Sequence, residues 1–141
     1  MVSKTHQISE LFYRGDQRGD LFIGQIAPHF PFQVHRFFFI KNVPSILQRG
    51  GHCLKSCKQA LICLSGTVDI TLKTPSSEEA VQLSTPNQCL FVPALIWREM
   101  SNFSSDSILL VLASTVYDES DYIREWHSYC SYYNKNTSSN K

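Results

Sequence analysis

The stretch GHCLKSCKQALICLSG, residues 51–66, carries the strongest structural signal in this chain of 141 residues. His52 and Leu54 stand two residues apart, so on an extended strand their side chains share one face. From Gln59 onward an apolar run continues until Gly66, as is typical of a strand that stops at a turn. The stretch therefore predicts a pair of short strands rather than a helix.

The same pattern of short strands and turns continues on both sides of this stretch. Short apolar or alternating runs, bounded by turn residues, predict strands over 21–26, 32–40, 59–64, 67–72, 80–83, 89–92 and 108–113. Helical spacing of apolar residues occurs only over 118–129, which begins with acidic residues. The order predicts an all-β sandwich or barrel followed by one C-terminal helix.

Composition limits the class of protein. Hydrophobic residues make up 43% and aromatic residues 12%, which excludes intrinsic disorder. The formal net charge of +1 argues against a nucleic-acid partner bound by bulk electrostatics. There is no apolar run of about 18 residues, so we expect no membrane span. The length fits one domain over 1–133, with a disordered tail rich in Asn, Ser and Lys over 134–141.

The cysteine usage indicates reduced thiols. The chain has five cysteines, an odd number, and no secretory leader is recognisable at its start, so we expect a cytoplasmic protein. A zinc site formed by His52, Cys53 and Cys57 is disfavoured, since a second pair of ligands at metal-binding spacing is missing. Adjacent residues such as His52 and Cys53 would also point to opposite faces of a strand.

The spacing from His52 to Gly66 matches the first motif of the cupins, and residues 93–98 occupy the frame of the second. Cupins that bind metal carry His, His, Glu and His at four positions, which this chain fills with His52, Leu54, Gln59 and Arg98. A leucine donates nothing and an arginine is a cation, so one good ligand in four cannot hold a transition metal. The resemblance implies a cupin jelly-roll barrel without a metal, and we expect no other cofactor.

A jelly roll still encloses a pocket, because side chains alternate between the inside and the outside of each strand. The polar residues on otherwise apolar strands are Arg36, Arg49, His52, Lys55, Gln59, Arg98 and Glu99. They fit a cationic pocket for an anionic ligand such as a diphosphate. Spacing alone does not favour this cationic pocket over the alternative, that these residues are ordinary surface charges.

Longer blocks of the sequence resemble the sugar-nucleotide 3,4-ketoisomerases, the WxcM-like cupin family. These blocks are RGDL (18–21), FPF (30–32) with Arg36, RGGH (49–52), QALICL (59–64), PALIWRE (93–99), LVLAS (110–114) and YDESDYIR (117–124). The resemblance covers about residues 8–130 in one register. It implies an isomerase that acts on thymidine diphosphate-linked 4-keto-6-deoxyglucose, and a homodimer that exchanges N-terminal strands.

The implied reaction moves a carbonyl from C4 to C3 of the sugar through an enediol, by proton transfer alone. Imidazole suits this chemistry, since its unperturbed pKa of about 6.5 is close to the working pH. His52 is therefore the expected catalytic residue. Substrate binding is expected from Arg36, Arg49, Lys55, Gln59, Trp97, Arg98 and Glu99. Arg98 occupies a position that the family links to the C4 configuration of the product, and it favours the gluco product.

The chain departs from the family where proton transfer is needed. Leu54 occupies the position of a second histidine, and Phe37–Phe39 stand where relatives tend to carry tyrosines. Three interpretations stay open: an isomerase that uses His52 alone or with His35 or the substrate's own oxygens, a non-catalytic binder of the sugar nucleotide in a surface-glycan pathway, and an enzyme that catalyses a related reaction on another nucleotide sugar.

Overall fold

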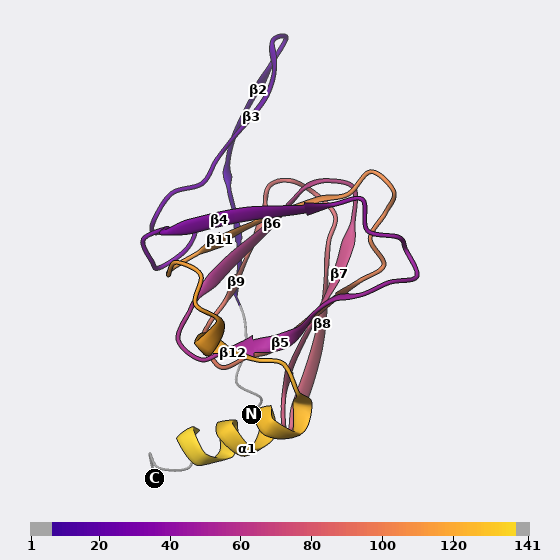
Figure 1. The fold of residues 1–141 in the computed structure, drawn as a ribbon. Coiled ribbons are helices and arrows are strands. Elements are labelled where there is room, and N and C mark those ends of the chain that lie inside the picture. Colours follow the sequence, from indigo (N-terminus) through magenta and orange to yellow (C-terminus); the bar gives the residue numbers. More distant parts are fainter. Residues whose placement is uncertain (1–6, 138–141) are drawn as a thin grey trace.

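The computed structural model describes residues 7–137, which form two five-stranded antiparallel sheets, a projecting hairpin and a C-terminal helix (Figure 1). The first sheet has the order β1 (Gln7–Glu10), β9 (Gln88–Val92), β6 (Gln59–Ser65), β11 (Ile108–Ala113) and β4 (Arg36–Lys41). The second has the order β12 (Tyr122–Ile123), β5 (Arg49–Leu54), β10 (Trp97–Ser101), β7 (Val68–Thr74) and β8 (Ser77–Leu83). The predicted all-β fold with one C-terminal helix is confirmed.

The two sheets face each other across the main core, to which both contribute alternate residues. β7 shows the pattern most clearly, since Val68, Ile70 and Leu72 are buried and the residues between them are partly exposed. From the opposite sheet, Leu61 and Val111 join the same apolar cluster. Each strand therefore buries one face, as its alternating sequence predicts.

A hairpin of β2 (Phe12–Asp16) and β3 (Gly19–Ile23) forms a separate two-stranded sheet that points away from the two large sheets (Figure 1). Its tip contains two Arg-Gly-Asp triplets, residues 14–16 and 18–20, with Arg18 ion-paired to Asp16. Several predicted strands have different bounds. The one predicted over 21–26 runs over Gly19–Ile23, the one predicted from Phe32 begins at Arg36, and the one predicted over 80–83 begins at Ser77.

The helix predicted over 118–129 is wrong in its bounds, because α1 runs over Trp126–Thr137. Residues before it form a 3-10 turn, Glu119–Asp121, and then strand β12, in which Tyr122 and Ile123 pair with Leu54 and Cys53. Pairing with β5 overrides the helical spacing. The helix instead begins after Glu125, whose carboxylate accepts hydrogen bonds from the backbone amides of His127 and Ser128.

Helix α1 also extends beyond its predicted end, so residues 134–137 of the expected tail are helical. Residues 138–141 of that tail lie outside the described residues. All five cysteines are free thiols, and four of them are buried. Within residues 7–137, no helix is both long and apolar enough to cross a membrane.

Candidate active site

A cavity of about 170 Å³ lies at one end of the space between the sheets, and it contains the imidazole expected to be catalytic. Strands β4 and β6 reach it from one sheet, and β5, β10 and β12 from the other. Its lining residues are Phe38, Ile40, Arg49, Gly50, His52, Gln59, Met100, Tyr122 and Arg124. The cavity thus brings together segments that are far apart in the chain. At its edge, Arg36 is hydrogen-bonded to Tyr122, which lies 86 residues later.

His52 stands on β5 directly across from Arg98 on β10, and its ring contacts that of Tyr122 with centroids 5.0 Å apart. Burial, and after it the nearby positive charge of Arg98, lower the pKa of His52 to about 4. Its Nδ1 is buried and lacks a hydrogen-bond partner among the described residues. At neutral pH the imidazole is therefore uncharged and able to accept a proton.

Arg98 is completely buried, which is rare for a charged side chain and requires partners. Its Nη1 donates to Oε1 of Gln59 at 2.6 Å, and its Nη2 donates to the carbonyl oxygen of Ile96 at 3.0 Å. Burial lowers the pKa of the guanidinium from its usual value, yet arginine stays charged in proteins. The result is a fixed positive charge behind the cavity, held by an amide rather than by a carboxylate.

The close approach of β5 to β10 depends on Gly50. The strand register shifts between Arg98 and Glu99, and Gly50 has a φ of 84° at this irregularity. A Cβ atom on Gly50 would lie 2.9 Å from the backbone oxygen of Arg98. Glycine therefore lets the two strands that carry His52 and Arg98 pack next to each other.

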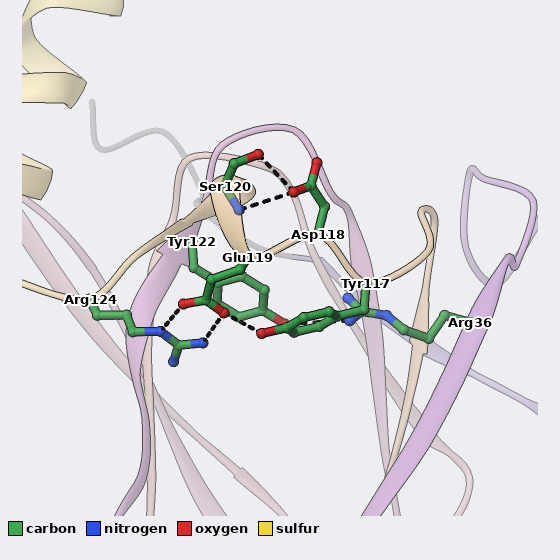
Figure 2. Close-up of polar contacts among 7 residues, drawn as sticks. All are labelled: Arg36, Tyr117, Asp118, Glu119, Ser120, Tyr122 and Arg124. Atoms are coloured by element: carbon green, nitrogen blue, oxygen red, sulfur yellow. Dashed lines mark hydrogen bonds and ion pairs between the residues drawn. The ribbon is translucent and has the colours of Figure 1, made fainter.

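A polar cluster of Arg36, Tyr117, Glu119, Tyr122 and Arg124 forms the edge of the cavity (Figure 2). Nη1 of Arg36 donates to the Tyr122 hydroxyl at 3.5 Å. Arg124 makes two hydrogen bonds to Glu119, both 2.9 Å long, and lies 4.4 Å from the centre of the Tyr122 ring. Tyr117 also donates to Glu119.

The charges in this cluster fix one another's ionisation states. Hydrogen bonds from Arg124 and then from Tyr117 lower the pKa of Glu119 to about 2, so its carboxylate is ionised at neutral pH. The same carboxylate raises the pKa of the Tyr117 hydroxyl, which stays protonated. The edge of the cavity therefore carries two guanidinium groups, those of Arg36 and Arg124, and one carboxylate that neutralises part of their charge.

Of the residues predicted to bind substrate, the structure brings Arg36, Arg49, Gln59 and Arg98 to the cavity or its edge. Trp97, Lys55 and Glu99 contact other parts of the molecule. Trp97 packs between Trp126 and Tyr129 and donates from Nε1 to Glu99 at 3.0 Å.

The reason is the alternation of side chains along each strand. On β10, Met100 lines the cavity and Arg98 reaches Gln59 behind it, so Trp97 and Glu99 face the other way, where Glu99 pairs with Lys73 at 3.3 Å. Lys55 lies past the end of β5, with its ammonium 5.4 Å from the ring centre of Tyr132 on helix α1. These three side chains do not line the cavity.

Sequence reasoning missed Tyr122 and Arg124 as cavity residues. It assigned Tyr122 to the buried face of a helix, because its spacing to Trp126 and Tyr129 fits a helical period. Both residues belong to the block YDESDYIR, whose length and polarity were the available signal. A packing role does not explain so many polar residues in one short stretch.

The residues present do not fit the metal of other cupins. At the four ligand positions, Leu54 is apolar and buried, and Oε1 of Gln59 already accepts a hydrogen bond from the guanidinium of Arg98. Residues 7–137 contain no group of three His, Cys, Asp or Glu side chains arranged to hold an ion. These four positions therefore do not form the metal site of a cupin.

Comparisons with known proteins identify the family. The protein-family model described as "FdtA: WxcM-like, C-terminal" matches residues 4–134. A TDP-4-oxo-6-deoxy-alpha-D-glucose-3,4-oxoisomerase from Aneurinibacillus thermoaerophilus is 35% identical over 117 residues, which are 83% of this chain and 84% of that protein.

Solved structures agree with this match. The sugar 3,4-ketoisomerase QdtA from Thermoanaerobacterium thermosaccharolyticum, in complex with TDP, is 36% identical and superposes with a TM-score of 0.90 over 94% of this chain and 97% of that one. A histidine-to-asparagine mutant of QdtA holds TDP-4-keto-6-deoxyglucose, with 34% identity, a TM-score of 0.91, and 96% and 99% of the two chains covered. The chain therefore belongs to the WxcM-like, C-terminal family, together with these 3,4-ketoisomerases.

Proposed function

We propose that the protein is an isomerase that converts TDP-4-keto-6-deoxyglucose to the corresponding 3-keto sugar nucleotide. The observation that carries the proposal is a neutral, partly buried imidazole, His52, inside a cavity with a cationic edge. Its similarity to relatives that are 3,4-ketoisomerases supplies the substrate class. Neither a purely binding role nor a different reaction is favoured by these relatives.

In the proposed mechanism, His52 accepts the proton from C3 of the sugar. The electron pair of the C3–H bond forms a C3=C4 double bond, and the former C4 carbonyl oxygen gains negative charge. The fixed positive charge of Arg98 faces this region and favours the enediolate. The protonated imidazole then returns its proton to C4, where the pair of the C3=C4 bond forms the new C4–H bond. The C3 hydroxyl loses its proton as its O–H pair forms the C3 carbonyl, and the C4 oxygen gains a proton and becomes a hydroxyl.

For binding, we propose that Arg36 and Arg49 attract the diphosphate, while Gln59, held by Arg98 behind it, lines the sugar end of the cavity. Arginine recognises phosphate oxygens with several donors at once, and Arg49 is exposed while Arg36 is partly buried. Lys55, Trp97 and Glu99 are left out of this proposed set, because they contact other residues outside the cavity. One imidazole that removes the C3 proton and returns it to C4 acts on a single face of the ring and gives the galacto configuration at C4, so the gluco product expected from Arg98 would require a donor on the opposite face.

We further propose a homodimer, because apolar residues are exposed on the hairpin and on the edge strand β4. Phe37 and Phe39 are 66% and 58% exposed, and Tyr13 and Leu21 on the hairpin are more than half exposed. A soluble chain rarely leaves such a surface uncovered. A second copy that receives the projecting hairpin would bury this surface.

The free thiols also support our expectation of a reducing compartment, the cytoplasm.

The test is direct turnover of TDP-4-keto-6-deoxyglucose, followed by NMR at C3 and C4, with thermal melting in the presence of TDP measured in parallel. The proposal expects a 3-keto product and stabilisation by TDP. Stabilisation without product would instead support a binding protein. If neither is observed, the substrate is wrong and another nucleotide sugar must be considered.

A further inference from the structure

The reaction requires two separate proton movements, and His52 accounts for one of them. Besides the proton that moves from C3 to C4, a proton must leave the C3 hydroxyl and another must reach the C4 oxygen. The imidazole of His52 is cationic once it has taken the C3 proton, and it must keep that proton for C4. The oxygen atoms therefore need their own donor and acceptor, for which a hydroxyl is suited.

Among the described residues that line the cavity, Tyr122 alone carries a hydroxyl group. It stands opposite Leu54 in the pairing of β12 with β5, so its side chain shares a face with Leu54 and His52. The ring contact of 5.0 Å between His52 and Tyr122 follows from this placement. We propose that Tyr122 is a catalytic residue that relays the proton between the two sugar oxygens.

The placement of Tyr122 is fixed from three sides. The carboxylate of Asp121 accepts hydrogen bonds from the backbone amides of Ser56 and Cys57, at 2.9 and 3.2 Å, and this anchors β12 to the end of β5. The buried side chain of Leu54 packs against the Tyr122 ring. On the other side, the guanidinium of Arg124 lies 4.4 Å from the ring centre. A ring held in this way keeps its hydroxyl in one position.

Arg36 prepares the hydroxyl for donation. Because Nη1 of Arg36 donates to the Tyr122 oxygen at 3.5 Å, the hydroxyl proton is left to point elsewhere (Figure 2). The positive charge of Arg36 also faces the oxygen on which negative charge develops when that proton leaves. Phe38, whose ring lies 5.6 Å from the Arg36 guanidinium, contributes no polar group on the opposite wall.

The steps balance without a co-reactant. As His52 removes the C3 proton, Tyr122 gives its hydroxyl proton to the C4 oxygen, so the intermediate is a neutral enediol. The Tyr122 phenolate then takes the proton of the C3 hydroxyl while the oxygen pair forms the C3 carbonyl. The C3=C4 pair accepts the proton from His52 at C4, and both side chains return to their starting states.

This inference rests on the proposed function, and its test separates the two. Tyr122→Phe should lower kcat by about 10²–10⁴-fold, the usual contribution of one acid–base group. KM and the affinity for TDP should stay unchanged, because the phenyl ring still packs on Leu54 and His52. The matched control, Tyr133→Phe, removes a hydroxyl from helix α1 outside the cavity and should keep wild-type kcat.

Rescue tests the chemistry rather than the packing. In the double variant Phe38→Tyr with Tyr122→Phe, a hydroxyl returns to the same cavity from the other sheet, and part of the lost kcat should return. Should Tyr122→Phe fail to fold, which thermal melting would show, 3-fluorotyrosine at position 122 keeps the packing. Fluorine acidifies a phenol, so the basic limb of the kcat profile should then move to lower pH.

Wild-type kcat in Tyr122→Phe would overturn the inference while leaving the isomerase proposal intact, as would an unmoved basic limb in the fluorotyrosine protein. An inactive wild-type protein would overturn the proposed function, and the inference with it. A large loss in Tyr122→Phe accompanied by equal loss of TDP affinity would assign Tyr122 to binding and also contradict the proposal.

Discussion

The protonation state of His52 sets the pH range in which the proposed reaction proceeds. Its pKa is about 4 in the folded protein, whereas an imidazole in an unfolded chain titrates near 6.5. The base form needed to accept the C3 proton is therefore present above about pH 4 and is lost as the pH falls through that value.

We predict that kcat/KM shows no loss between pH 8 and 6 and declines only toward pH 4. The measurement is a pH–rate profile of the wild-type protein with TDP-4-keto-6-deoxyglucose. Between pH 6.5 and 4 the unfolded chain binds more protons at this site than the folded protein does. The free energy of unfolding should therefore decrease as the pH falls through this window. An acidic limb centred near pH 6.5 would contradict the burial of His52.

Leu54 is a second residue whose environment predicts a measurable effect. It is fully buried among Cys57, Ala113 and Tyr122. Leu54→Ala should lower the free energy of unfolding by about 2–5 kcal/mol, measured by urea denaturation, because it leaves a cavity below the Tyr122 ring. The control Leu47→Ala, at a side chain that is 53% exposed, should change stability by less than about 0.5 kcal/mol.

Motif residues were the part of the site that sequence could predict. His52, Gln59 and Arg98 occupy fixed positions in the cupin spacing, and strand alternation places all three toward one space. The same alternation explains why Trp97 and Glu99, next to Arg98, point away from the cavity. Trp97 contacts Trp126 of helix α1, and Glu99 pairs with Lys73. Tyr122 and Arg124 could not be placed, because their position depends on the long-range pairing of β12 with β5.

At the scale of elements, the strands were easier to predict than the helix. β6, β7 and β11 lie close to their predicted ranges, because apolar alternation is a local signal. The helix bounds were displaced because Asp121 bonds to Ser56 and Cys57, more than sixty residues earlier in the chain. Contacts of this kind leave no periodic trace in the sequence.

Helix α1 is held to the second sheet by one buried phenol. The hydroxyl of Tyr129 donates to the carbonyl oxygens of Leu95 and Lys73, at 2.8 and 3.1 Å. Tyr129→Phe should lower the free energy of unfolding by about 1–3 kcal/mol, because both acceptors lose their partner. Tyr132→Phe on the same helix is the control, and an equal effect of the two substitutions in urea denaturation would refute this role.

The whole molecule has an apolar surface that a single chain leaves uncovered. We predict that the wild-type protein sediments with twice the mass of one 16.1 kDa chain. The double variant Phe37→Lys with Phe39→Lys places charges on the outer face of β4 and should sediment as a monomer. Ile46→Lys, in a loop where the side chain is 90% exposed, is the control and should stay dimeric. A monomeric wild-type protein would contradict the proposed assembly.

The central claim is that His52 carries the proton from C3 to C4 of a keto-sugar nucleotide. The most direct test is to incubate TDP-4-keto-6-deoxyglucose with the protein in deuterated water and to record NMR spectra of the sugar. We predict that the wild-type protein forms a 3-keto product whose C4 hydrogen is protium carried over from C3, and that His52→Asn forms no product. Unchanged substrate with the wild-type protein, deuterium at C4 in the first-formed product, or equal product formation by His52→Asn would contradict the claim.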